Sequence, residues 1–331
     1  MSEGADAGLI VENLRTRFGS DRAGATVVDG VSFALQPGRT IALVGESGCG
    51  KSATALSLMR LIEPPGRIIS GRVLLDGRDL LAMSEREMEG TRGAKIGMIF
   101  QDPLTSLNPA LTIGWQISET ILAHQPVSRA AAEQKAIELL RHVGVNDAER
   151  RAHDYPHHFS GGMRQRVLIA AAISCRPKVI IADEPTTALD VTVQAKILRL
   201  LRDLQQEMHA SMLLITHDLG VVAAMADEVM VMYAGRIVER ADVDTLFHNP
   251  GHPYTKALLA CATGIEDDRG VPLEPIGGSA PDLRHPPPGC RFAPRCSAVQ
   301  DLCRAQDQSL RALAGGHEVA CVVVEQERAD A

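Results

Sequence analysis

The segment GESGCGKS, residues 45–52, constrains the fold more than any other part of the chain. It follows a short apolar run, residues 40–44, and precedes SATALSLMRLI, in which apolar residues recur with helical spacing. A glycine-rich turn of the pattern GxxxxGK[ST] between a strand and a helix is a phosphate-binding loop. Its backbone N–H groups point at anionic oxygens, at the positive end of the following helix. We therefore expect Lys51 to reach the β- and γ-phosphates of a nucleotide and Ser52 to bind Mg²⁺.

Apolar runs of strand length alternate with helical patterns in much of the chain. KVIIADEP (178–185), SMLLITHD (211–218) and EVMVMYAGRIVER (228–240) are predicted to supply strands. Between the first two, apolar residues fall on one helical face at Ile197, Leu201, Leu204 and Met208. This alternation predicts an α/β fold with a parallel core sheet covered by helices.

Other stretches add to this core. GRVLLDGRDL (71–80) contains an Asp-Gly hairpin signal and predicts a small antiparallel β subdomain. Residues 106–175 have helical character without strong strand runs and predict a helical insertion. Beyond about Cys261 the composition becomes typical of loops, with many Pro and Gly. We expect a nucleotide-binding domain over residues 1–262 and an accessory extension over residues 263–331.

Two adjacent carboxylates, Asp183 and Glu184, end the predicted strand VIIADE. Asp183 is expected to hold the water shell of the metal, as the second half of a phosphate-loop site. Glu184 is then free to orient and polarise the attacking water. A solvated acidic pair at a strand end is the alternative, and the phosphate loop upstream argues against it.

A second helix start with phosphate-binding character lies in FSGGMRQR, residues 159–166. Ser160, Gly161 and Gly162 would present a hydroxyl and exposed N–H groups to an anion. One nucleotide hardly needs two such helix ends from one subunit. The economical arrangement is a head-to-tail pair in which each chain completes the site of the other. Taken alone, the motif is more often an ordinary helix cap.

The motifs together resemble those of a known family. Their order, GESGCGKS, QDP, SGGMRQ, VIIADEP, ALD and ITHD, is similar to that of the ATP-binding subunit of ABC transporters over most of residues 9–262. The resemblance implies an α/β P-loop NTPase of the ABC type, with a parallel core sheet, an antiparallel β subdomain, a helical insertion subdomain and a small C-terminal extension. It also implies hydrolysis of ATP with Mg²⁺.

The resemblance further implies roles for single residues. Phe18 would stack on adenine, His217 would contact the γ-phosphate, and Gln101 would bind Mg²⁺ and water and link the site to membrane subunits. Without the family, His217 is equally explained as a structural histidine. Phe159 replaces the usual leucine before the Ser-Gly-Gly motif and keeps its apolar packing. The expected catalytic residues are Glu184, His217 and Lys51. The expected Mg²⁺ ligands are Ser52, Gln101 and Asp183. The expected nucleotide-binding residues are Phe18, Gly45, Glu46, Ser47, Gly48, Cys49, Gly50, Lys51, Ser52, Ala53, Gln101, Ser160, Gly161, Gly162, Gln165, Asp190 and His217.

Longer stretches narrow the resemblance to one branch of the family. MIFQDPLTSLNPALTIGWQI, YPHHFSGGMRQRV and HNPGHPYTKALLA are similar to sequences of the oligopeptide/dipeptide importers. The implied partners are a second ABC ATPase, expected to be a paralogue, two membrane permeases and an extracytoplasmic substrate-binding protein. The implied location is the cytoplasmic face of the inner membrane. Because cargo is selected by other subunits, nickel and glutathione stay open as alternatives to peptides.

Composition excludes several other classes of protein. A net charge of −7 argues against a general nucleic-acid binder. The acidic start MSEGADAGLI is not typical of a signal peptide. The best apolar run, VLIAAAISC, is far shorter than the roughly 18 residues of a membrane span. A soluble ABC ATPase of translation or DNA repair is disfavoured, because the chain has a single phosphate loop and no heptad run.

The extension carries most of the cysteines. In a reducing compartment they are not expected to form disulfides. Four thiolates suit Zn²⁺ or a [4Fe–4S] cluster, and this segment lacks the tight C-x₂₋₄-C pairs of zinc sites. The resemblance to importer subunits whose tail holds a cluster also favours [4Fe–4S], with zinc or unligated thiols as alternatives. The cluster is expected to order an accessory tail away from the ATP chemistry. Its ligands would be Cys290, Cys296, Cys303 and Cys321, while Cys49, Cys175 and Cys261 are expected to be packing or loop residues.

Overall fold

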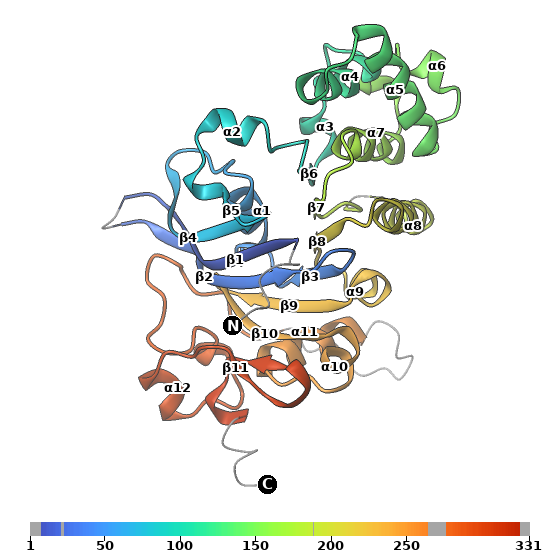
Figure 1. The fold of residues 1–331 in the computed structure, drawn as a ribbon. Helices are drawn as coiled ribbons and strands as arrows, with labels where there is room; N and C mark the ends of the chain where they lie inside the picture. The colour runs from blue at the N-terminus through green and yellow to red at the C-terminus, as the bar shows by residue number, and fades with distance from the viewer. Residues whose placement is uncertain (1–7, 21–22, 188, 264–275, 325–331) are drawn as a thin grey trace. The chain divides into compact units, whose positions relative to one another are not determined.

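The structure is a computed structural model and describes residues 8–20, 23–187, 189–263 and 276–324 (Figure 1). These residues pack as two compact units. The first unit contains residues 8–9, 34–40 and 74–215. The second unit contains residues 10–33, 41–73 and 216–324.

Parallel strands form the centre of the first unit. β7 (Val179–Asp183) lies between β6 (Ile96–Ile99) and β8 (Ser211–Ile215), and every residue of these strands is buried. This arrangement explains why both predicted strands are continuously apolar, because a strand covered on two faces has no solvent-facing residues.

Helices surround this part of the sheet. Between β6 and β7 the chain is helical, as the pattern over residues 106–175 predicts. The 18-residue α8 (Val191–Met208) buries Ile197, Leu201 and Leu204, which confirms its predicted apolar face. The remaining helices of the unit are α2 (Glu85–Glu89), α3 (Pro103–Ser106), α4 (Ile113–His124), α5 (Arg129–His142), α6 (Ala148–Arg151) and α7 (Gly161–Ile173).

The predicted Asp-Gly hairpin is present. β4 (Gly66–Leu75) pairs antiparallel with β5 (Arg78–Asp79), and the turn residues Asp76 and Gly77 both have positive φ, 50° and 74°. A turn with φ > 0 at both central residues matches the twist of the strands on either side.

The second unit contains most of β1 (Leu9–Phe18), β2 (Ala25–Leu35) and β4, in the order β2-β1-β4. Its other strands follow the order β11-β12-β10-β9-β3, with β3 parallel to β9. Their bounds are β3 (Thr40–Val44), β9 (Glu228–Tyr233), β10 (Arg236–Asp242), β11 (Arg311–Ala312) and β12 (Glu318–Val319). The helices are α1 (Lys51–Leu58), α9 (Leu219–Met225), α10 (Val243–His248), α11 (Pro253–Thr263) and α12 (Asp301–Ala305).

The predicted strand segment 228–240 is a hairpin. β9 and β10 pair antiparallel from Tyr233 opposite Arg236, around a turn in which Ala234 and Gly235 have φ of 48° and 88°. Gly235 supplies the turn signal that ends the apolar run.

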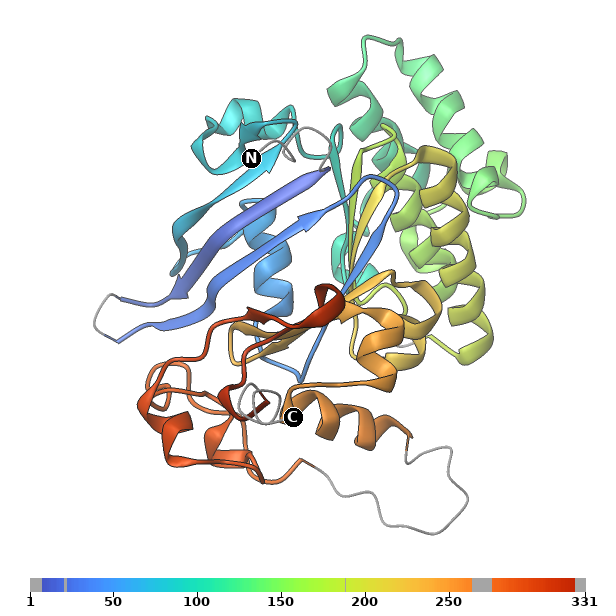
Figure 2. The ribbon, with the colours of Figure 1, turned by 60° about the horizontal axis from the view of Figure 1, so that its bottom comes forward.

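The extension joins the second unit instead of forming a separate body. β12 pairs with β10, with Val319 opposite Glu239. Phe292 belongs to the same buried apolar cluster as Tyr233 and Tyr254. Figure 2 shows the extension, coloured red, beside α10 and α11. A Pro/Gly-rich segment with little apolar surface is thus ordered by the sheet edge and the core it packs on.

Within the described ranges, no helix has both the length and the apolar character that a membrane crossing requires.

Candidate functional site

The phosphate loop connects β3 to α1 in the second unit, and α1 begins at Lys51. Lys51 is only 6% exposed, and its Nζ donates hydrogen bonds to the carbonyl oxygens of Gly45 and Glu46 at 2.7 and 2.9 Å. Gly50 has φ of 114°, and a Cβ there would lie 2.2 Å from the carbonyl oxygen of Val27. Only glycine fits this position, so local backbone geometry explains the motif.

Cys49 occupies a buried position in the loop. Burial raises the pKa of its thiol, and the nearby Lys51 ammonium opposes this only in part. The thiol is therefore protonated at neutral pH, which disfavours oxidation. Its carbonyl oxygen accepts the N–H of Gly235, which ties the loop to the β9–β10 turn.

Glu46, the second residue of the loop, is held by residues far along the chain. Its N–H donates to the Tyr254 hydroxyl at 2.9 Å, and its carboxylate accepts both Nη atoms of Arg295 at 2.7 and 2.9 Å. The hydrogen bond to Glu46 raises the pKa of Arg295, so the guanidinium stays charged. Arg295 belongs to the extension, so the expectation that the extension lies away from the ATP chemistry is wrong.

The carboxylate pair lies at the end of β7 in the first unit. Asp183 is 4% exposed. Glu184 has φ of 47°, and its N–H donates to the Ile215 carbonyl at 2.9 Å. Its Oε2 accepts hydrogen bonds from Gln101 Nε2 at 3.0 Å and from Thr187 Oγ1 at 2.7 Å. Gln101 and Glu184, both expected around the attacking water, are thus in direct contact. Thr187 had no sequence signal beyond its place three residues after Glu184.

The Ser160 helix start is exposed in the same unit. Ser160 is the N-cap of α7, and in the described residues its side chain makes no capping hydrogen bond. A Cβ on Gly162 would lie 2.6 Å from Val193 Cγ1, so the close approach of α8 requires glycine there. Phe159 is buried beneath the Arg151 guanidinium, 5.4 Å from its ring centroid, as expected for the residue that replaces leucine.

Gln165 does not share this exposure. It is 2% exposed, and its Nε2 has no hydrogen-bond partner within the described part of the chain. The nucleotide contact expected for Gln165 stays a prediction.

The other expected residues lie at the ends of elements. Phe18 is half-buried at the end of β1, and His217 is exposed just before α9. Asp190 is the N-cap of α8 and accepts the Val193 N–H at 2.9 Å. Its capping contact is structural, and the part in nucleotide binding expected for Asp190 stays a prediction.

Three of the four cysteines of the extension, Cys290, Cys303 and Cys321, lie in or against one apolar cluster, and Cys296 packs against the cluster of Tyr233 and Tyr254. The Cys290 N–H donates to the Cys303 carbonyl at 2.7 Å, and Cys303 and Cys321 share one buried cluster. Burial, with smaller effects of Cys321 and Cys303, raises the pKa of Cys290 to about 11. No group of three or more His, Cys, Asp or Glu side chains within residues 8–20, 23–187, 189–263 and 276–324 is arranged to hold a metal ion. The structure therefore does not support the [4Fe–4S] assignment, which stays a prediction.

The strand, the glycine loop with its buried lysine and the helix that follows it define a P-loop nucleotide-binding protein. Family models agree: "ABC transporter" matches residues 28–187, and "Oligopeptide/dipeptide transporter, C-terminal region" matches residues 238–303. The second match begins before residue 263, where the sequence predicts the extension to start.

Similar proteins extend this match to nearly the whole chain. The oligopeptide transport ATP-binding protein AppD of Bacillus subtilis is 50% identical, over 97% of this chain and 98% of its own length. The dipeptide transport ATP-binding protein DppD of Escherichia coli is 46% identical, over 95% of each. The ATP-binding cassette MJ0796, solved as a dimer bound to ADP and Pi, superposes with a TM-score of 0.64 at 25% identity, over 71% of this chain and 98% of that one.

The chain belongs to the family of ATP-hydrolysing subunits of ABC transporters, in the oligopeptide/dipeptide branch. The predicted fold class is confirmed by the same comparisons.

Proposed function

We propose that this chain hydrolyses ATP to power the import of dipeptides or oligopeptides through partner permeases. The observation that carries the proposal is the 50% identity to an oligopeptide transport ATP-binding protein over 97% of the chain. The match of residues 238–303 to the C-terminal region of this branch supports it independently of the ATPase motifs.

Glu184 is the proposed general base. Gln101 and Thr187 both donate hydrogen bonds to its Oε2 and orient the carboxylate. The water attacks the γ-phosphorus in line, the bond to the ADP oxygen breaks, and the proton of the water passes to the Glu184 carboxylate. Lys51 binds the β- and γ-phosphate oxygens by exchanging its bonds to the loop carbonyls for bonds to phosphate.

The expected Mg²⁺ ligands have the donor chemistry that this ion prefers. Asp183, Ser52 and Gln101 supply carboxylate, hydroxyl and amide oxygens, which are the ligands that Mg²⁺ prefers. Asp183 is buried at the end of β7. When bound, the ion neutralises negative charge that develops on the phosphate oxygens.

A second ATPase chain is part of the proposal. The exposed Ser160 helix start would bind the γ-phosphate of the nucleotide held by the phosphate loop of the other chain, and ATP would close the pair. We expect the second chain to be a paralogue, and the assembly to sit on the cytoplasmic face of the inner membrane with two permeases and a substrate-binding protein. Cargo selection by those subunits leaves nickel or glutathione as the second candidate.

We also infer a [4Fe–4S] cluster in the extension, because four thiolates are the ligand set of such a cluster and the extension supplies four cysteines. Protein purified without oxygen should be brown and contain iron and sulfide. Stoichiometric zinc without iron would overturn this assignment.

Transport itself is the test of the function. The chain, its partner ATPase and the permeases are reconstituted in vesicles with the binding protein, and ATP-dependent uptake of labelled di- and oligopeptides is measured. We expect uptake with the native chain and none with Glu184→Gln. Uptake of nickel or glutathione in place of peptides would refute peptide import and leave the ATPase role intact.

A further inference from the structure

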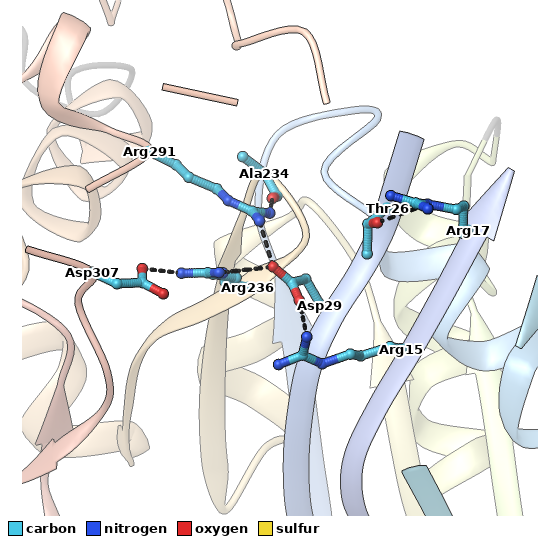
Figure 3. Close-up of polar contacts among 8 residues, drawn as sticks. All are labelled: Arg15, Arg17, Thr26, Asp29, Ala234, Arg236, Arg291 and Asp307. Carbon is cyan, nitrogen blue, oxygen red and sulfur yellow. Dashed lines mark hydrogen bonds and ion pairs between the residues drawn. The ribbon is translucent and has the colours of Figure 1, made fainter. Parts of the chain in front are cut away.

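The extension contacts the phosphate loop directly at Glu46 and is linked to Cys49 through Gly235 and Asp29. At Glu46, the side chain binds Arg295 and the N–H binds Tyr254. At the other end of the loop, the Cys49 carbonyl accepts the N–H of Gly235, whose carbonyl accepts the N–H of Asp29. Asp29 in turn binds the guanidinium group of Arg291 from the extension (Figure 3).

Arg295 is held by several contacts besides the one to Glu46. Its side chain is only 5% exposed, and its Nε and Nη2 also donate to the carbonyls of Gly277 and Ile276 at 2.8 and 3.1 Å. Its guanidinium lies over the rings of Tyr233 and Phe292, 5.8 and 6.0 Å from their centroids. Because these contacts leave the Arg295 side chain little rotamer freedom, its bidentate pair with the carboxylate fixes the position of Glu46.

The charge of Glu46 makes this contact matter for nucleotide binding. Glu46 is a carboxylate within the loop that must receive a polyphosphate anion. Its carbonyl oxygen also accepts a hydrogen bond from Lys51, the residue that binds the phosphates. A carboxylate freed from Arg295 would repel the phosphates and could draw the Lys51 ammonium toward itself, and both effects weaken binding.

We propose that Arg295 is a positioning residue of the nucleotide site: it neutralises Glu46 and fixes the loop, so that the C-terminal extension controls the affinity of the chain for nucleotide phosphates. The proposal requires only that the chain binds nucleotide and is independent of the transported cargo.

The test is the binding of Mg²⁺-ADP to the full chain, measured by isothermal titration calorimetry. ADP reaches the loop through its phosphates and does not require a second chain. Arg295→Ala should weaken ADP binding about 10- to 30-fold, from the electrostatic effect of one uncompensated charge at a partly buried site. Arg284→Ala is the matched control, because Arg284 is an exposed arginine of the extension paired only with Asp282 in the described residues, and it should leave binding unchanged.

A double variant separates positioning from simple packing. In Arg295→Ala with Glu46→Gln, the repelling charge is gone, so ADP affinity should recover by at least threefold relative to Arg295→Ala. If Arg295 only packs the extension, the double variant binds no better than the single one, and the proposal is overturned. Arg295→Ala with native affinity and native melting temperature overturns it as well. A native chain that fails to bind ADP would instead refute the nucleotide role.

The native chain provides a second test, which needs no variant to fold. Because coupling between two sites is reciprocal, saturating Mg²⁺-ADP must stabilise the extension if the extension stabilises the ADP site. We expect amide hydrogen exchange of residues 290–296 to slow on ADP binding by the same factor, about tenfold or more. Unchanged exchange of this segment at saturating ADP would contradict the proposal.

Discussion

The phosphate loop and the Ser160 helix start are both glycine-rich N-termini of helices, but their surroundings differ. The loop is held by its own unit: Lys51 binds its carbonyls, and Glu46 and Cys49 are tied to residues of the extension and of the β9–β10 turn. Ser160 is exposed, and in the described residues its hydroxyl caps no N–H of α7.

The difference shows that a phosphate-binding motif alone does not make a complete site. Both helix starts offer N–H groups at the positive end of a helix dipole. Only the loop has a buried cation and a second layer of contacts that fix its geometry. In the proposed pair of ATPases, the Ser160 start would receive a ligand that the other chain has already bound.

Stopping hydrolysis should separate ATP binding, which the phosphate loop supports, from ATP turnover. Glu184→Gln removes the base oriented by Gln101 and Thr187, and should slow ATP turnover about 10²- to 10⁴-fold while ATP still binds. Phosphate release and ATP titration measure the two effects. Glu149→Gln, at an exposed glutamate paired with Arg141, is the control. Near-normal turnover in Glu184→Gln would remove Glu184 from the role of base.

Removing the buried ammonium group of Lys51 should lower the affinity of the phosphate loop for nucleotide. Lys51→Ala is expected to weaken Mg²⁺-ADP binding about 100-fold, since truncating one member of a buried charge pair costs 2–5 kcal/mol. Lys178→Ala, at an exposed lysine that binds Asp76, should bind as the native chain does. Equal affinities for all three proteins, measured by calorimetry, would show that the loop does not hold the phosphates.

For the Ser160 helix start we expect the opposite of the result for Lys51→Ala. Ser160→Ala should leave Mg²⁺-ADP binding by the single chain unchanged. In the Glu184→Gln background it should weaken ATP-dependent pairing about tenfold, the effect of one lost hydrogen bond to a charged group. Analytical ultracentrifugation, with and without the partner ATPase, measures the pairing. Ser128→Ala, at the N-cap of α5, is the control. Pairing that survives Ser160→Ala unchanged would contradict the role of this helix start.

Acid should weaken the ion pairs of Asp29, which link the extension to the phosphate loop through Gly235. Burial acts to raise the pKa of Asp29, but Arg236, Arg291 and Arg15 outweigh it and hold the pKa below its usual value of 3.8. The ion pairs therefore stabilise the fold fully above about pH 4, and this stabilisation is lost as pH falls through the lowered pKa. Urea unfolding between pH 6 and 3 should show a smaller acid loss in Asp29→Asn than in the native chain. The same loss in both would exclude Asp29 as the source.

Much of the site could be predicted because its motifs are local. Residues 45–52 carry their own backbone requirements, as the positive φ of Gly50 shows, and Asp183 and Glu184 follow directly from the end of a buried strand. The burial of the Gln165 side chain was not predicted, since helical spacing alone did not reveal that it turns inward. Arg295 was missed because no motif marks it: its neighbours in the sequence APRC are a proline and a cysteine.

The sequence by itself determined the phosphate loop, the carboxylate pair, the Ser-Gly-Gly helix start and the α/β class, since each depends on residues within a few positions of one another. The tertiary structure alone decided that the extension adds a strand to β10 and that Arg295 binds Glu46 across 249 residues. Such contacts depend on how segments far apart in the sequence pack against each other. A local sequence pattern does not show which distant side chains this packing brings into contact.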